Sequence, residues 1–129
     1  MSISPVFALV DGRKLHREVL RSFLQEIEPE VRVVAVKNSE ELFELLSLCP
    51  LSALFIHNNI TTESGIDVAR HIGLEPALKA RNMKLVIYGD ARVETVVQKL
   101  GGSFICTEGS TKIFVDRFCV VADALRKDC

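Results

Sequence analysis

Five short apolar runs alternate along this chain with five segments of helical periodicity, and no other feature of the sequence constrains the fold as strongly. The runs cover residues 6–10, 31–36, 53–56, 85–88 and 103–106. They are short and rich in β-branched or aromatic residues, as is typical of strands that are buried on both faces of a parallel sheet. The alternation therefore predicts a (βα)5 chain with a doubly wound parallel sheet, because each crossover must be right-handed.

The segments between the runs place apolar residues at helical spacing. Asn38 and Glu41 form a weak variant of the capping box at the start of the second helix, and Ser64 with Asp67 gives a similar start to the third. The first helix is expected to have one apolar stripe, made of Leu15, Val19, Leu20, Phe23, Leu24 and Ile27.

The last two helices are predicted in the same way. Gly101 and Gly102 are expected to end a fourth helix, whose apolar residues are Val93, Val96, Val97 and Leu100. Ser110 opens a fifth helix, whose expected buried side is Ile113, Phe114, Phe118, Val121, Ala122 and Leu125. Pro76 interrupts residues 73–83, where we expect an extended loop or a short separate helical turn.

Composition sets the class of protein. The 129 residues fit a single domain, 1–129, and 48% of them are apolar, which is enough for a core without metal or disulfide support. A net charge of −1 argues against a nucleic-acid partner. No apolar run is long enough to span a membrane, and the start of the chain does not resemble a secretory signal, so we expect a cytoplasmic protein.

Two groups of residues have ordinary structural interpretations. The four cysteines, which contain no CxxC pair, are interpreted as reduced, with Cys106 and Cys119 in the core. A small basic cluster at the start of the first helix is interpreted as a solvated helix face. It consists of Arg13, Lys14, Arg17 and Arg21.

Any site should lie where the strands end. In an open α/β sheet, ligands bind beyond the carboxyl ends of the strands, at the point where the strand order reverses. The polar residues and glycines at these ends are Asp11, Gly12, His57, Asn58, Asn59, Gly89, Asp90, Thr107 and Glu108.

These residues carry a resemblance to bacterial response-regulator receiver domains that covers essentially the whole chain. Residues 9–18, Leu-Val-Asp-Gly-Arg-Lys-Leu-His-Arg-Glu, resemble the opening of such a domain. Gly65 lies eight residues after His57 and Ile60 three residues after it, and Phe104 lies three residues before Thr107, each at the family's spacing. The resemblance implies a flavodoxin-like receiver fold with strand order 2-1-3-4-5, in which Phe104 matches the family's switch aromatic.

The departures from the family are informative. Aspartyl phosphorylation there requires two acids that hold Mg²⁺, an acceptor aspartate, a Thr or Ser on the fourth strand and a lysine on the fifth. The corresponding residues here are Asp11, Gly12, His57, Gly89 (or Asp90, depending on register) and Thr107. Only Asp11 retains the family's chemistry, so we expect a pseudo-receiver that is not phosphorylated on aspartate.

His57 admits three interpretations. It could accept a phosphoryl group, or act as a pH switch whose charged form is favoured by Asp11 and Asp90. The favoured interpretation is a polar residue that neighbouring groups satisfy at a decayed site. A metal site of His57, Asp11, Asp90 and Glu63 lacks any ligand-spacing signature, so no metal and no cofactor are expected. His16 and His71 are interpreted as helix-surface or packing residues.

The resemblance implies protein–protein interaction in a two-component-type pathway, and the absence of P-loop, GxGxxG and GxSxG motifs argues against an enzyme. The expected partner is a protein, or a second copy of the chain. The expected face is the fourth helix, fifth strand and fifth helix, with candidate residues Arg92, Val93, Gln98, Phe104, Lys112 and Asp116. A sensor that responds to a ligand or to pH at His57, or a residual phosphoacceptor, is the alternative.

Overall fold

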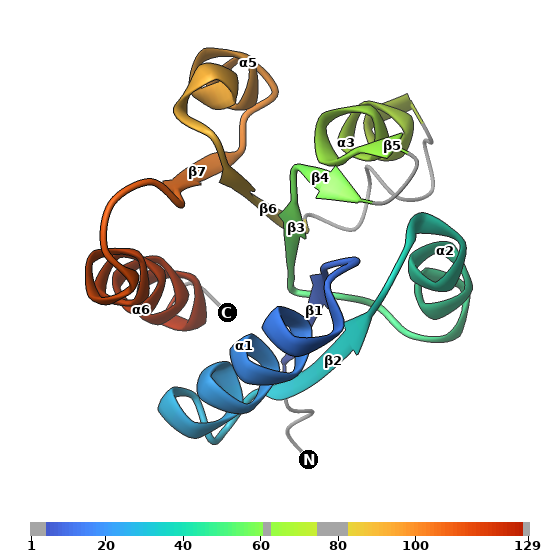
Figure 1. Cartoon of the computed structure of the whole chain (residues 1–129). Helices are drawn as coiled ribbons and strands as arrows, with labels where there is room; N and C mark the ends of the chain where they lie inside the picture. The colour runs from blue at the N-terminus through green and yellow to red at the C-terminus, as the bar shows by residue number, and fades with distance from the viewer. Residues whose placement is uncertain (1–4, 61–62, 75–82, 128–129) are drawn as a thin grey trace.

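A five-stranded parallel sheet runs through the centre of the molecule in the computed structural model, which describes residues 5–60, 63–74 and 83–127 (Figure 1). Its strands are β1 (Val6–Val10), β2 (Arg32–Val36), β3 (Ala53–His57), β6 (Lys84–Gly89) and β7 (Ser103–Cys106). The strands lie in the order β2-β1-β3-β6-β7. This is the predicted order 2-1-3-4-5. The difference in detail is a two-stranded antiparallel hairpin after β3, formed by β4 (Asn59–Ile60) and β5 (Glu63–Ser64).

Helices cover both faces of the sheet. In Figure 1, α1 and α6 lie on one face, and α2, α3 and α5 lie on the other. The helices are α1 (Lys14–Ile27), α2 (Ser39–Leu48), α3 (Gly65–Leu74), the short 3₁₀ helix η1 (Ala91–Val93), α5 (Glu94–Lys99) and α6 (Thr111–Lys127). The predicted α/β fold is therefore confirmed, whereas the prediction made from Pro76 falls largely on residues 75–82, which lie outside the described residues.

The side chains of β1 show why the sheet needs two helical layers. Phe7 and Leu9 enter the core beneath α1 and α6, whereas Ala8 and Val10 enter the core beneath α2 and α3. All five residues of β3 are buried. Strands with apolar side chains on both faces are stable only when both faces are covered.

Two of the predicted helix starts are confirmed by their caps. The Asn38 side chain accepts a hydrogen bond from the Glu41 amide at 2.9 Å, and Glu41 in turn accepts one from the Lys37 amide. The Ser64 hydroxyl accepts from the Asp67 amide at 3.1 Å at the start of α3. The bonds from the Glu41 and Asp67 amides each satisfy an amide that has no partner within its helix.

Some residues predicted to be buried are exposed. On α1, Leu15 is 71% exposed and Val19 is 58% exposed, while Leu20 and Leu24 are buried. Leu15 lies five positions before Leu20, which places it about 140° around a helix of 3.6 residues per turn. The single stripe predicted for α1 is therefore wrong at its first two positions. The same correction applies to Ile113, which is expected on the buried side of the last helix and is 45% exposed.

Candidate functional site at the carboxyl edge of the sheet

An open hollow of about 800 Å³ lies where β1 and β3 end. Its floor and rim come from the β1–α1 loop, the end of β3 and the β4–β5 hairpin. The lining residues are Gly12, Arg13, His57, Asn59, Ile60, Glu63 and Ser64. The structure thus brings Gly12 and His57 together at the edge where the sequence places a site.

Asp11 lies beside this hollow and is completely buried. Its Oδ1 accepts hydrogen bonds from the Arg13 backbone amide at 2.9 Å and from Arg13 Nε at 3.0 Å. Its Oδ2 accepts from Arg13 Nη2 at 2.9 Å and from the Tyr88 hydroxyl at 2.7 Å. Both carboxylate oxygens are therefore engaged by groups of the protein itself.

These contacts keep Asp11 charged. Burial by itself would raise the pKa of Asp11, but the hydrogen bonds from Arg13 and Tyr88 and the charge of Arg13 outweigh it, and the pKa lies below its usual value. The hydrogen bond to Asp11 raises the pKa of Arg13. The pair is a charge-assisted fork, the strongest type of hydrogen-bonded contact between side chains.

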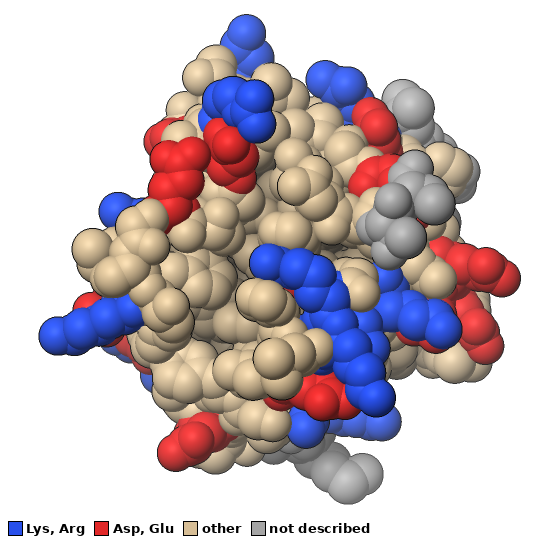
Figure 2. Space-filling model, in the orientation of Figure 1, with Lys and Arg blue, Asp and Glu red and all other residues tan. Residues whose placement is uncertain are grey.

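The basic cluster at the start of α1 has a different role from the one predicted. Lys and Arg side chains gather over the β1–α1 loop and the first part of α1 (Figure 2). Arg13 binds the Asp11 carboxylate, and Arg17 Nη1 donates to the Asp11 backbone carbonyl at 2.9 Å. The interpretation of this cluster as a solvated face therefore misses the contacts that Arg13 and Arg17 make with Asp11, although the Arg13 side chain is also 41% exposed.

Tyr88 supplies the remaining contact to Asp11 from the middle of the sheet. It lies on β6 opposite His57 of β3 and is completely buried. Burial first, and then the charge of Asp11, raises the pKa of Tyr88 well above its usual value, so the hydroxyl remains a donor. Its ring lies 5.9 Å from the ring of Phe114 and 6.3 Å from that of Phe118, both on α6.

His57 is buried at the end of β3 and satisfied locally. Its Nδ1 lies 3.0 Å from the Asn59 carbonyl oxygen, and its ring lies 5.1 Å from the Tyr88 ring. Burial and the nearby charge of Arg13 lower the pKa of His57, against the opposing effect of Asp11. The expectation that its charged form is favoured is therefore wrong, because burial and the charge of Arg13 together outweigh the effect of Asp11.

The residues after β6 and β7 do not enter the hollow. Gly89 ends β6, and a Cβ atom added there would lie 3.1 Å from Asn58 Cβ. The Asp90 carboxylate accepts from the Arg92 amide and from Arg92 Nε, at 2.8 and 3.1 Å. Thr107 lines a separate cavity of about 220 Å³ between α1 and α6, and Arg13 lines both.

A metal site is not assembled in the described part of the chain. No three or more His, Cys, Asp or Glu side chains there lie close enough together to hold an ion. The set of His57, Asp11, Asp90 and Glu63 is divided, because Arg13 occupies Asp11 and Arg92 occupies Asp90. Nothing in the geometry of these side chains provides the oxygen cage that Mg²⁺ requires.

The predicted interaction face comprises η1, α5, β7 and α6. Arg92, Gln98, Lys112 and Asp116 are exposed there. Val93 and Phe104 are half-buried, and both pack against the apolar cluster that contains Ile87 and Val97.

The described cysteines at 49, 106 and 119 are free and half-buried, so Cys106 and Cys119 lie at the margin of the core rather than within it.

Sequence reasoning missed the roles of two residues in this site. From the sequence, Arg13 is interpreted as one of the solvated cations at the start of α1, and Tyr88 only as a residue of the predicted strand 85–88. A usable signal existed for each: Arg13 follows two residues after an acid that ends a buried strand, and Tyr88 carries the one hydroxyl group in the run 85–88. A buried tyrosine hydroxyl needs a partner, which Asp11 supplies.

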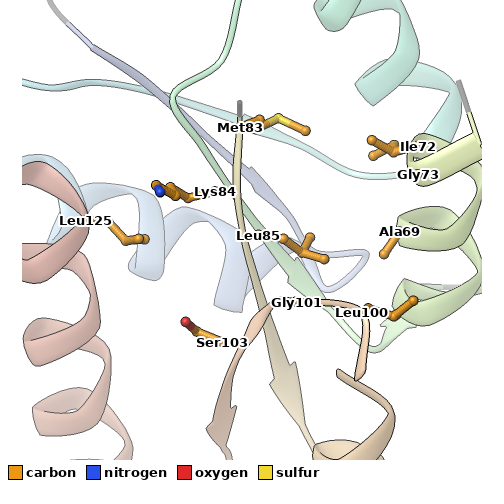
Figure 3. A pocket seen from close by; sticks show the side chains of 10 residues that line it. All are labelled: Ala69, Ile72, Gly73, Met83, Lys84, Leu85, Leu100, Gly101, Ser103 and Leu125. Carbon is orange, nitrogen blue, oxygen red and sulfur yellow. The ribbon is translucent and has the colours of Figure 1, made fainter. Parts of the chain in front are cut away.

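A further apolar hollow lies at the opposite edge of the sheet. It has a volume of about 390 Å³, and in Figure 3 Leu85, Ala69 and Leu100 face one another across it while Lys84 points to the other side of the strand. It lies where β6 and β7 begin, at the edge of the sheet opposite the Asp11–Arg13 pair. Lys84 and Ser103 are the polar side chains in its lining, so we place the candidate functional site at the carboxyl edge instead.

Comparison with known proteins identifies the fold. No protein-family model matches the sequence, and no curated protein is detectably similar to it. Three similar solved structures are receiver domains. A response-regulator receiver domain from Methylobacillus flagellatus is 12% identical, with a TM-score of 0.77 over 95% of this chain and 99% of that one.

The other two give the same result. The receiver domain of the Francisella response regulator 1452 is 13% identical, with a TM-score of 0.76 over 96% of this chain and 98% of that one. A receiver domain of a histidine kinase from Syntrophus aciditrophicus is 16% identical, with a TM-score of 0.76 over 96% and 91%. This chain has the fold of the response-regulator receiver domains.

Proposed function

We propose that this chain is a signalling domain of the receiver type that acts through protein–protein contacts and without aspartyl phosphorylation. The observation that carries the proposal is the saturation of Asp11, whose two oxygens together accept four hydrogen bonds from Arg13 and Tyr88. A carboxylate engaged in this way has little capacity left to bind a cation. No chemical reaction is proposed for the chain, and its proposed setting is the cytoplasm.

The other positions support the same proposal. The residue at the family's acceptor position is His57, whose Nδ1 is engaged by the Asn59 carbonyl group. Gly89 brings no hydroxyl group, and Thr107 brings no cation to the hollow. Together with the engaged Asp11, these differences affect binding of the metal, attack on the phosphorus and neutralisation of the phosphoryl oxygens.

The proposed contact surface is centred on α6. Ile113 and Val120 are 45% and 70% exposed, and Asp116 lies between them at i+3. These spacings place the three residues on one face of the helix. Exposed large apolar residues beside charged ones are typical of a protein-binding surface. Among the described residues, no helix is long and apolar enough to cross a membrane.

Intact-mass spectrometry after incubation with acetyl phosphate and Mg²⁺ tests the chemical part of the proposal. We expect no phosphoryl adduct, while an active receiver treated in parallel becomes phosphorylated. A stoichiometric adduct would overturn the proposal and would make His57 or Asp11 a phosphoacceptor, which peptide mapping would distinguish.

Analytical ultracentrifugation tests the contact surface with a second copy of the chain as the partner. Val120→Glu is expected to weaken self-association, because it places a charge on the apolar part of the face. Leu48→Glu is the matched control, since Leu48 is 77% exposed at the end of α2, on the other side of the sheet. Equal effects of the two substitutions would exclude α6 as the surface.

A further inference from the structure

We propose that Asp11, Arg13 and Tyr88 form a latch through which the β1–α1 loop controls the packing of the first half of α6. Arg13 holds Asp11 in place, Asp11 accepts the hydrogen bond of Tyr88, and the Tyr88 ring packs against α6. The inference rests on the proposed function only in taking α6 as the helix that contacts a partner.

The first link joins Arg13 to Asp11. The Arg13 side chain is 41% exposed, whereas that of Asp11 is not exposed at all. Without Arg13, a buried carboxylate would be left with too few partners, and it would regain them most readily by turning towards the solvent in the hollow. Because Arg13 is the solvent-accessible member of the pair, loss of its contact with Asp11 is the change that would open the latch.

The second link joins Asp11 to Tyr88. The Tyr88 hydroxyl is buried and donates to Asp11 Oδ2 at 2.7 Å. If Asp11 turned away, the hydroxyl would have to find another acceptor or remain unsatisfied, and a buried unsatisfied donor is costly. The ring would then be drawn away from its present position.

The third link joins Tyr88 to α6. The Tyr88 ring lies between His57, at 5.1 Å, and the aromatic pair Phe114 and Phe118, at 5.9 and 6.3 Å. Phe114 and Phe118 also contact each other, with their ring centroids 5.9 Å apart. Because cores are closely packed, a displacement of Tyr88 must be met by movement of these two side chains and of the helix that carries them.

A double-mutant cycle tests the coupling. Hydrogen exchange is followed in residues 111–118 for the wild-type chain, Arg13→Met, Tyr88→Phe and the double variant, with α2 as an internal reference. Arg13→Met is expected to raise exchange in 111–118 by about an order of magnitude and to leave α2 unchanged. In the Tyr88→Phe background it is expected to have no further effect, because the phenyl ring needs no acceptor.

Three outcomes would overturn the latch. Arg13→Met could raise exchange in residues 111–118 equally with tyrosine or phenylalanine at position 88, or not raise it at all. It could also raise exchange in α2 as strongly as in residues 111–118. Arg92→Met is the control, since it removes an exposed pair with Asp90 of the same sequence spacing that makes no such link, and it should leave α6 unchanged. Should Arg13→Met fail to fold, Arg13→Lys keeps the charge but cannot bind both oxygens, and its exchange is judged by the same criteria.

Tyrosine fluorescence gives an independent measurement. Tyr88 is the one tyrosine of the chain and there is no tryptophan, so the emission reports on the latch alone. A tyrosine bonded to a carboxylate is quenched, because its excited state loses a proton to that group. Arg13→Met should therefore brighten the emission, and unchanged emission would contradict the latch. Neither measurement uses a phosphodonor or a partner, so failure of the latch and failure of the proposed function are distinguishable.

Discussion

At the end of β1 a carboxylate is fully buried and yet charged, because Arg13 and Tyr88 supply the hydrogen bonds that water would otherwise supply. An isolated buried charge would cost several kcal/mol, and removing one partner of a buried pair is far more damaging than replacing both. The individual contacts of Asp11 therefore have consequences that can be measured one residue at a time.

Removing only the Tyr88 hydroxyl should destabilise the fold. Tyr88→Phe keeps the ring contacts but removes a buried hydrogen bond to a charged group, for which we expect a loss of about 2 kcal/mol in the free energy of unfolding. Urea denaturation measures it. Ser47→Ala is the control, because the Ser47 hydroxyl bonds an exposed helix carbonyl group and its loss should be nearly neutral. A loss for Tyr88→Phe as small as the nearly neutral change expected for Ser47→Ala would show that the Asp11–Tyr88 bond contributes nothing.

His57 should make the stability depend on pH. Burial and the charge of Arg13 lower its pKa in the folded chain, so between that pKa and the unfolded value of about 6.5 the unfolded chain binds more protons. This contribution to stability is present above that unfolded pKa and is lost as the pH falls towards the folded pKa. The free energy of unfolding, measured at a series of pH values, should therefore change less with pH in His57→Gln than in the wild-type chain.

His71→Gln provides the comparison, since His71 is exposed on α3. This variant removes an imidazole that does not line the hollow, so a change seen only in His57→Gln is assigned to His57. If His57→Gln and the wild-type chain lost stability in parallel on acidification, the pH dependence would have another origin.

At the scale of the elements, α1 shows how one helix can divide its apolar residues between two roles. Leu20 and Leu24 anchor it to the sheet, and Leu15 and Val19 face solvent. The apolar spacing on this helix correctly predicted that a helix forms, but it could not indicate how wide the buried face would be. That width depends on how α6 packs beside α1, which is a tertiary property.

Two truncations on α1 should therefore differ strongly. Leu24→Ala opens a cavity in the core and should cost about 3 kcal/mol, whereas Leu15→Ala should change the stability by less than about 0.5 kcal/mol. Chemical denaturation of both variants makes the comparison. A loss for Leu15→Ala comparable to that for Leu24→Ala would restore the single stripe that the sequence predicted.

The two glycines of α3 offer a matched pair. A Cβ atom at Gly65 would lie 2.9 Å from the His57 carbonyl oxygen and 2.9 Å from Ile56 Cγ2, whereas one at Gly73 would meet no described atom within 4 Å. We expect Gly65→Ala to destabilise the fold by about 1–3 kcal/mol through overpacking. Gly73→Ala should be neutral or stabilise by up to about 1 kcal/mol, because alanine favours the helix. Thermal unfolding measures the stability of both variants. Equal melting temperatures for Gly65→Ala and Gly73→Ala would contradict the expected overpacking at Gly65.

At the scale of the whole molecule, the order of strands and helices and the edge that carries the site were predictable, whereas the contacts within the site were not. The apolar runs predicted all five strands of the main sheet to within a residue at either end, since burial on both faces leaves a continuous signal. The positions of Asp11, Gly12 and His57 at one edge followed from that topology. The roles of Arg13 and Tyr88 did not, because they depend on where side chains point after residues far apart in the sequence have been brought together.

The molecule as a whole should be indifferent to magnesium. A ligand that binds only the folded chain raises the melting temperature. Because Arg13 and Tyr88 already occupy Asp11, millimolar Mg²⁺ should shift the melting temperature no more than a sodium salt of matched ionic strength. Differential scanning calorimetry makes the measurement. A saturable increase with Mg²⁺ alone would show that Arg13 can be displaced from Asp11 by a cation.

The arrangement around Asp11 also bears on whether single substitutions could give the proposed pseudo-receiver a site for phosphoryl chemistry. His57→Asp would place a second carboxylate beside the hollow, yet Arg13 would still occupy Asp11, and Gly12 would still contribute no metal ligand. Removing Arg13 first would leave Asp11 buried and unpaired before any cation could replace it. If the proposed function is right, no single substitution would therefore give this edge of the sheet a metal site, because the contacts of Asp11 and the residues at positions 12 and 57 would have to change together.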